Sequence, residues 1–246
     1  MSPTFGPQHS TALLHTHKLH LHKNQMQRRP HFILNSLFLL VWLVCASWAA
    51  SNLDKMTRLA EQRYGHAATQ TILAWRNLVQ LGLTTSPEEK LNQANSFFNR
   101  RVRFEDDLTI WRKSDYWATP LETIGKGAGD CEDFAIAKYI TLREMGVPAE
   151  KLRLIYVRAR IGGPQSTISQ AHMVVGYYAS ANEEPLVLDN LISEIRPASR
   201  RTDLFPIFSF NSQGLWAGGT TVSDPTARLS NWRDALSRMS DEGFEP

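Results

Sequence analysis

The sequence predicts an α+β fold in which N-terminal helices precede an antiparallel sheet. Apolar residues recur at spacings of three and four between residues 53 and 98, whereas beyond residue 152 they alternate with polar residues. The composition, with 42% apolar and 21% charged residues, is that of an ordinary globular protein. No internal repeat is visible, which argues against a repeat-built scaffold.

Three helices are expected before residue 102. The helical spacing over residues 53–80 is interrupted at Tyr64-Gly65, and Gly82 ends the second helix. A third helix starts at Ser86-Pro87, because Ser is a good N-cap, Pro suits the first turn, and the two glutamates that follow favour the positive end of the helix dipole. Residues 103–129 show no sustained period and are expected to form an ordered loop.

A buried helix and a set of strands are expected in the second half of the chain. The helix begins at Asp130 and stops at Gly146-Val147-Pro148, and apolar side chains on most of its sides indicate burial. Leu215-Trp216 is expected in a turn, and the polar C-terminus in a loose helix over residues 224–239. Strands are expected at residues 152–158, 172–178, 186–191 and 206–210, with short connections that favour antiparallel neighbours.

The first 49 residues are interpreted as an N-terminal extension and a signal peptide, and residues 50–246 as a single domain. The apolar run at residues 32–44 follows two arginines and precedes small residues that end at Ala49, which is the order typical of a secretory signal. The run is shorter than the ~20 residues that span a bilayer. We therefore expect cleavage after Ala49, a periplasmic location and no stable membrane span; translation from Met26 would give a signal of normal length.

The charge distribution argues against nucleic-acid binding. The net charge is +3, but the first 49 residues contain four basic residues and no acid. Removing these four from the 27 basic residues leaves 23 basic groups against 24 acidic ones. A body that is nearly neutral, without a basic run, offers no surface for several phosphates.

Three residues form a candidate catalytic constellation: Cys131, His172 and Asp189. Cys131 is the only cysteine left after export, and a helix N-terminus favours its thiolate. A histidine on a strand and a carboxylate on the next strand would supply the base and its orienting partner. Each also has an ordinary structural interpretation: a small buried thiol, a hydrogen-bonded core histidine and a strand-ending aspartate.

Three acidic residues surround the candidate nucleophile. Asp130, Glu132 and Asp133 should raise the pKa of the thiol by like-charge repulsion and so oppose its activation. One interpretation is that Asp130 caps the helix while the other two complement its dipole. The alternative is a divalent cation, with Ca²⁺ favoured by all-oxygen ligands, that neutralises the acids beside the thiol.

Four segments resemble a known family, the bacterial transglutaminase-like cysteine proteinases of the LapG-type periplasmic group. They are Gly-Asp-Cys-Glu-Asp-Phe at 129–134, Ala-His-Met-Val at 171–174, Leu-Val-Leu-Asp-Asn at 186–190 and the aromatic stretch at 115–120. The resemblance continues through Arg200-Arg-Thr-Asp-Leu and covers most of residues 85–220. It implies a papain-like, transglutaminase-like core.

The resemblance also implies roles for the six residues named above. Cys131 would be the nucleophile, His172 the general base and acid, and Asp189 its orienting partner, while the three acids would take part in binding Ca²⁺. The implied substrate is the N-terminal region of a large repeats-in-toxin type adhesin, cut at a dialanine-type site so that biofilm disperses. The implied regulator is an inner-membrane receptor for cyclic di-GMP.

Two other functions are compatible with the same residues. A transglutaminase-type acyl transferase would use the same thioester with a lysine amine as acceptor, and a non-catalytic calcium-dependent module would only bind its partner. For hydrolysis, the backbone N–H of Cys131 is one oxyanion donor, and the loop that holds Tyr116 and Trp117 is a candidate for the second.

Overall fold

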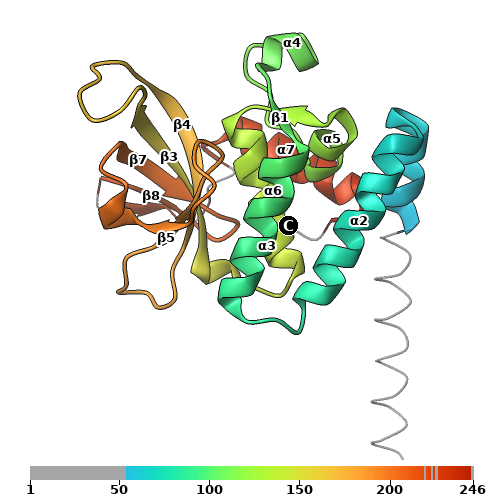
Figure 1. Cartoon of the computed structure of the whole chain (residues 1–246), viewed down its shortest axis with the longest axis horizontal. Helices are drawn as coiled ribbons and strands as arrows, with labels where there is room; N and C mark the ends of the chain where they lie inside the picture. The colour runs from blue at the N-terminus through green and yellow to red at the C-terminus, as the bar shows by residue number, and fades with distance from the viewer. Residues whose placement is uncertain (1–53, 219, 223, 225–226, 245–246) are drawn as a thin grey trace, which may run out of the picture. The chain divides into compact units, whose positions relative to one another are not determined.

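A computed structural model of the chain describes residues 54–244, except residues 219, 223, 225 and 226. The signal peptide expected at residues 1–49 lies outside this range. The described residues form a helical part and a sheet, and helix α6 packs against the sheet (Figure 1). Within the described range, no helix is long and apolar enough to cross a membrane.

The N-terminal helices begin and end close to the predicted positions. A helix over residues 54–64 is followed by α2 (His66–Gly82) and α3 (Pro87–Arg101). Gly65 separates the first two with a φ of 80°, a conformation that suits glycine. The Ser86 hydroxyl accepts a hydrogen bond from the Glu89 N–H at 3.2 Å, so the predicted N-cap is confirmed.

The expectation of a loop over residues 103–129 is wrong, because four short elements occupy this range. They are β1 (Arg103–Phe104), α4 (Asp107–Trp111), α5 (Pro120–Lys126) and β2 (Ala128–Gly129). A capping box starts α5: the Thr119 hydroxyl accepts from the Glu122 N–H, and the Glu122 carboxylate accepts from the Thr119 N–H. The Thr-Pro-Leu-Glu sequence at residues 119–122 is the local signal for this helix.

The central helix α6 (Cys131–Glu144) connects the helical part to the sheet. Ten consecutive residues, 133–142, are buried, which confirms the predicted burial. On one side, the Trp75 indole N–H donates to the Thr141 hydroxyl at 2.8 Å. The other side packs against β4. Because both sides are covered, the N-terminus of α6 is held at the boundary between helices and sheet.

The sheet has seven strands in the order β6-β5-β4-β3-β7-β8-β9, and each neighbouring pair is antiparallel. This arrangement confirms the predicted α+β class, and the first four predicted strands correspond to β3, β4, β5 and β7. The bounds are β3 (Leu152–Arg160), β4 (Ser169–Tyr177), β5 (Leu186–Leu188), β6 (Arg196–Pro197), β7 (Leu204–Phe210), β8 (Leu215–Ala217) and β9 (Thr220–Val222).

The C-terminal part differs from the prediction in two places. Leu215 and Trp216 lie in β8 and not in a turn, because the Asn211 carboxamide oxygen accepts from the N–H groups of Gln213 and Gly214 and closes a hairpin before them. The last helix, α7 (Ser230–Glu242), starts later than expected. Short 3₁₀ turns at Ala149–Lys151 and Ala198–Arg200 precede β3 and follow β6.

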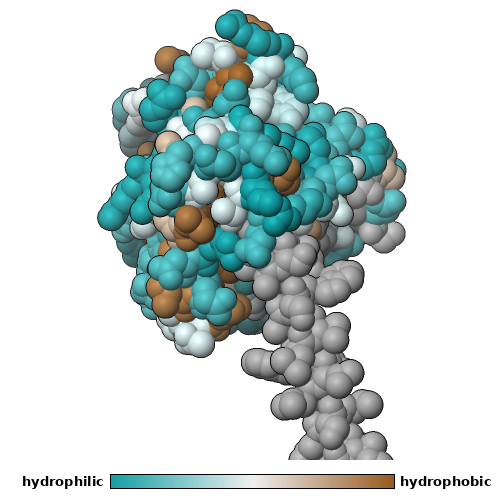
Figure 2. Space-filling view, turned by 90° about the vertical axis from the view of Figure 1, so that its right-hand side faces the viewer, coloured by the Kyte–Doolittle hydropathy of each residue, from teal (hydrophilic) through white to brown (hydrophobic). Residues whose placement is uncertain are grey.

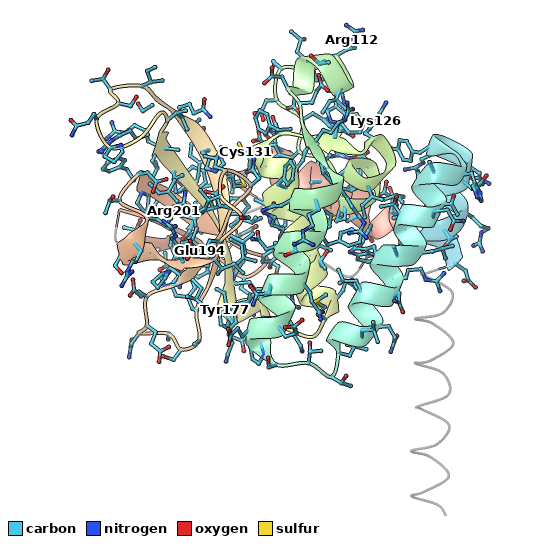
Figure 3. All side chains as sticks on the ribbon, viewed as in Figure 1. Arg112, Lys126, Cys131, Tyr177, Glu194 and Arg201 are labelled. Atoms are coloured by element: carbon cyan, nitrogen blue, oxygen red, sulfur yellow. The ribbon has the colours of Figure 1, made fainter. Side chains whose placement is uncertain are left out.

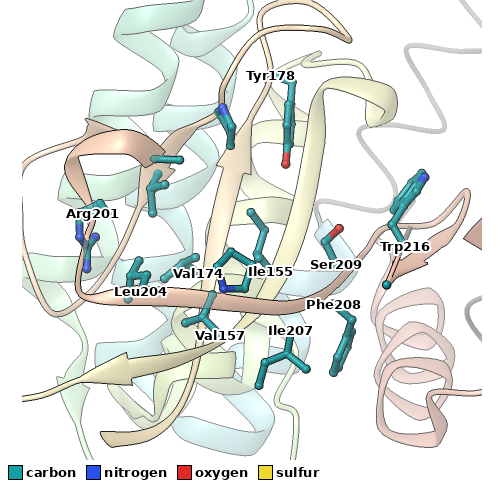
Figure 4. Close-up of a pocket in the computed structure, with 15 residues that line it drawn as sticks. Ile155, Val157, Val174, Tyr178, Arg201, Leu204, Ile207, Phe208, Ser209 and Trp216 are labelled. Carbon is teal, nitrogen blue, oxygen red and sulfur yellow. The ribbon is translucent and has the colours of Figure 1, made fainter. Parts of the chain in front are cut away.

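The two faces of the sheet carry separate apolar clusters. Leu154, Met173 and Val175 belong to the main core with the helices, whereas Ile155 and Val174 belong to a second cluster on the opposite face. A cavity of about 440 Å³ opens over this second cluster (Figure 4). On the α2 side of the molecule, the surface is mainly hydrophilic with only small hydrophobic groups (Figure 2).

Candidate active site

Cys131 is the first residue of α6 and lies where the helical part meets the sheet (Figure 3). Its thiol donates a hydrogen bond to the Glu132 carboxylate at 2.7 Å, and the backbone N–H of Met173 donates to its sulfur. Cys131 and His172 line the same pocket, of about 330 Å³, together with Asp130 and Glu132. The predicted nucleophile and the predicted base therefore face one common space.

His172 and Asp189 form a direct pair. His172 lies within β4, and Asp189 immediately follows β5, the neighbouring strand. The Nε2 of His172 is 2.7 Å from the Oδ1 of Asp189, and both side chains are almost completely buried. Because Nε2 is engaged with the carboxylate, Nδ1 is the ring nitrogen left to exchange a proton with the thiol.

Asp189 is fixed by groups other than the histidine. Its Oδ2 accepts from the Arg201 guanidinium at 2.6 Å, and its Oδ1 also accepts from the Leu191 N–H at 3.0 Å. Burial acts to raise the pKa of Asp189, but the hydrogen bond and charge of His172, the Leu191 N–H and Arg201 together hold that pKa well below its usual range. Asp189 therefore stays ionised and is held in one orientation.

Sequence reasoning missed the buried Arg201, which is only 3% exposed. It lies beyond β5, within the Arg200-Arg-Thr-Asp segment that the family resemblance includes. Its guanidinium also binds Asp203, with contacts at 3.1 and 2.8 Å. Nothing local in the sequence links Arg201 to the triad, because the contact depends on the path of the chain after the sheet edge.

The acidic cluster is larger than predicted. Besides Asp130, Glu132 and Asp133, it includes Asp107 at the start of α4 and the exposed Asp115. Ligand oxygens of Asp107, Asp130 and Asp133 lie within 4.8 Å of one another, as do those of Asp107, Asp115 and Glu132. Pairing of β1 with β2, including the Glu105 N–H to Gly129 carbonyl bond, brings the start of α4 beside the start of α6.

The cluster fits a divalent cation. Asp107 Oδ1, Asp130 Oδ1 and Asp133 Oδ2 are buried and have no hydrogen-bond partner among the described residues. Burial and the neighbouring carboxylates raise the pKa of Asp107 to about 6 and that of Asp130 to about 10, and they also raise the pKa of Asp133. Crowded carboxylate oxygens without donors are the ligands that Ca²⁺ prefers.

The alternative role of Asp130 as a helix cap is not supported, because its side chain makes no capping hydrogen bond. Gly129 is required just before it: a Cβ at position 129 would lie 2.7 Å from the Asp133 Cβ. The Asp133 Oδ1 in turn accepts from the Ala118 N–H at 2.7 Å, and Asp107 accepts from the Tyr116 N–H. The acids thus anchor the loop that precedes α5.

The side chains of Tyr116 and Trp117 donate hydrogen bonds to other groups, and a second oxyanion donor from the loop that holds them stays a prediction. The Tyr116 hydroxyl donates to the Glu122 carboxylate at 2.8 Å. The Trp117 indole N–H donates to Asp115 at 3.0 Å, and its ring stacks on Phe210 at 5.7 Å between centroids. Both residues stabilise the fold around the site.

The acids also control the thiol. Burial raises the pKa of Cys131 well above its usual range, and the charge and hydrogen bond of Glu132 and the charge of Asp130 raise it further. The Met173 N–H acts in the opposite direction. Two of the carboxylates that suit a cation, Asp130 and Glu132, therefore raise the thiol pKa in addition to burial.

This fold, with a cysteine at a helix N-terminus and a buried histidine–aspartate pair, defines a cysteine proteinase of the transglutaminase-like class. Residues 66–209 match the family described as bacterial transglutaminase-like cysteine proteinase, and the chain belongs to that family. A search among curated proteins gave no match.

Solved structures of Legionella pneumophila LapG are similar to this chain. One is 39% identical, with a TM-score of 0.65, and the alignment covers 76% of this chain and 97% of that protein. The calcium-bound form is 40% identical with a TM-score of 0.64, covering 76% and 98%. The EGTA-treated form is 39% identical with a TM-score of 0.66, covering 76% and 97%. The chain is thus a homologue of LapG.

Proposed function

We propose that the protein is a calcium-dependent cysteine endopeptidase in which Cys131 is the nucleophile, His172 the general base and acid, and Asp189 the orienting carboxylate. The observation that carries this proposal is the buried 2.7 Å contact between His172 and Asp189, which opens on the same pocket as Cys131. A non-catalytic binding module would not need an ionised Asp189 that is hydrogen-bonded to His172 and held in place by Arg201 and the Leu191 N–H.

The reaction follows from these positions. His172 Nδ1 takes the thiol proton, and the Cys131 sulfur attacks the peptide carbonyl. The Cys131 backbone N–H, which lies at the helix start, stabilises the oxyanion. His172 then gives its proton to the departing amine, leaving a thioester. Water, deprotonated by His172, hydrolyses the thioester and restores the thiol. Asp189 holds the histidine in the required tautomer throughout.

Asp107, Asp130, Glu132 and Asp133 would hold Ca²⁺. When bound, the ion would neutralise the carboxylates that raise the thiol pKa. The support is the set of unpartnered carboxylate oxygens in this chain and the calcium-bound form of a homologue. Asp107 and Asp133 also hold the backbone of the preceding loop, so they position the ligand cluster against α6.

We also propose a substrate, a location and a form of control, each implied by the family resemblance. The protein acts in the periplasm after its signal peptide is removed, and it cuts the N-terminal region of a large repeats-in-toxin type adhesin at a dialanine-type site. Cleavage releases the adhesin and disperses biofilm, and an inner-membrane cyclic di-GMP receptor restrains the protease. Similarity to LapG supports these assignments.

The test is incubation of residues 51–246 with the N-terminal fragment of a large repeat adhesin from the same genome. Wild type should cut it with calcium and not with chelator, whereas Cys131→Ala and His172→Ala should be inactive and remain folded by circular dichroism. Cutting by Cys131→Ala, or full activity in chelator, contradicts the proposal. Product masses separate the alternatives, because hydrolysis shortens the fragment and acyl transfer joins it to an amine.

A further inference from the structure

One edge of β4 is open beside the nucleophile. β3 pairs with β4 along its whole length, but β5 pairs only with residues 175–177 on the other edge. Among the described residues, no strand pairs with that edge over residues 169–174. Residues 169–171 are exposed, whereas the rest of the strand is buried.

The edge is open because the chain leaves the sheet after β5. The Asn99 side chain of α3 donates to the Asp189 carbonyl at 2.8 Å, and the Asn95 side chain donates to the Ser193 carbonyl at 2.9 Å. These two bonds hold residues 189–193 against α3, and no residue of this stretch pairs with β4. The position next to residues 169–171 is therefore left free by a fixed part of the fold.

The backbone N–H and C=O groups of successive residues in a strand point to opposite edges. This fixes which residues of β4 face the open edge on the side of the Cys131 sulfur. The Met173 N–H donates to the Cys131 sulfur, so it points away from β3. Two residues earlier, Ala171 has its N–H and C=O on the same side, about 6.6 Å along the strand. Ala171 lines the pocket that contains Cys131 and His172, so these groups face the place where a substrate must lie.

We propose that the substrate binds as an extended segment that adds to the open edge of β4, with its backbone hydrogen-bonded to Ala171 and its scissile carbonyl at Cys131. This inference rests on the protease function proposed above. Strand addition needs main-chain groups only, so the enzyme accepts an extended linker segment and rejects a folded domain.

Two exposed apolar side chains define where the substrate side chains lie. Phe104 is 56% exposed and Leu191 is 42% exposed, and both line the pocket around Cys131. Phe104 comes from β1, and Leu191 follows β5 on the stretch held by α3. Apolar substrate side chains on either side of the scissile bond would cover them, whereas charged ones would leave them in contact with polar groups.

The first test is an N-methyl scan of a peptide that spans the bond cut in the adhesin fragment, with wild-type enzyme and calcium. Methylation of the one amide that pairs with the Ala171 carbonyl, within about two residues of the scissile bond, should lower kcat/KM tenfold or more. Methylation of the neighbouring amides, apart from the scissile one, should lower kcat/KM less than threefold. A scan without such a single sensitive amide overturns the strand pairing.

The second test compares Ala171→Pro with Ser169→Pro. Each removes one N–H from the same edge, where proline is tolerated, but Ser169 is two residues farther from the sulfur. Ala171→Pro should lower kcat/KM tenfold or more, Ser169→Pro less than threefold, and iodoacetamide should alkylate Cys131 equally fast in both. Equal peptide cleavage by both variants overturns the pairing.

The tests separate this inference from the proposed function. If wild type does not cut the adhesin fragment, the proposed function fails and the pairing fails with it. If wild type cuts the fragment but the N-methyl scan is flat, only the pairing fails. If Ala171→Pro does not fold, the scan on wild type still decides.

Discussion

Replacing Lys138 with Met should stabilise the protein in a way that depends on pH. Lys138 lies on α6 in the core, is 1% exposed, and its ammonium has no hydrogen-bond partner among the described residues. Its Nζ lies 5.6 Å from the centroid of the Phe134 ring. Burial lowers its pKa from 10.5 to about 7, although the charge of Asp189 acts to raise it.

The size of the effect follows from the pKa shift. At ~1.4 kcal/mol per pKa unit, the cost of burying the charged form has an upper limit of about 5 kcal/mol below pH 7. Above pH 7 the folded state releases the proton while the unfolded state keeps it up to pH 10.5, so the cost falls as pH rises. At pH 9 about 2 kcal/mol should remain. Met keeps a similar shape without the charge.

The assay is urea unfolding of wild type, Lys138→Met and Lys126→Met at pH 6 and pH 9. Lys126 is exposed, so its variant controls for removing a lysine from the surface. Lys138→Met should show a clear gain in the free energy of unfolding at pH 6 and a smaller gain at pH 9. A gain of the same size at both pH values, or a loss at pH 6, refutes the reasoning.

Three further predictions concern the site. Arg201→Gln should lower kcat about tenfold or more with little change in KM. The acid limb of the pH–rate profile should also move to higher pH, because Asp189 loses a positive charge that lowers its pKa. An unchanged profile contradicts this prediction. Gly129→Ala should weaken calcium binding at least tenfold in calorimetry, because the new Cβ displaces Asp133; wild-type affinity would count against the assignment. Asp107→Asn should lose cleavage at limiting calcium and regain it at high calcium, and an identical calcium titration would remove Asp107 from the ligand set.

The parts of the fold that local sequence determines were predictable. The N-cap of α3, the break at Gly65, the burial of α6 and the partial alternation in β3 each depend on residues within one turn or one strand. The short elements between residues 103 and 129 were missed because they carry too few residues for a period to be seen. Only the capping box of α5 left a local signal.

The site was predictable only where motif residues carry the chemistry themselves. The sequence marks Cys131 at a helix start and places His172 and Asp189 on neighbouring strands, although Asp189 follows β5 in the structure. Asp107 joins the acids through the parallel pairing of β1 with β2, strands of two residues each that have no sequence signal. Arg201 reaches Asp189 only because the chain returns past the sheet edge.

The residues that sequence reasoning missed share a physical role: they hold groups whose charge or direction the reaction needs. Asp189 alone, buried beside a histidine, would be driven toward its protonated form by burial; the Arg201 guanidinium opposes this and fixes its second oxygen. Such bracing contacts cannot be found by residue type, because an arginine on a loop is usually a solvent-exposed charge. They can be found by asking which buried charge in the predicted site lacks a partner, since a buried carboxylate requires one. Asp189 meets this requirement with the Arg201 guanidinium, and the acids around Cys131 would meet it with the metal ion proposed above.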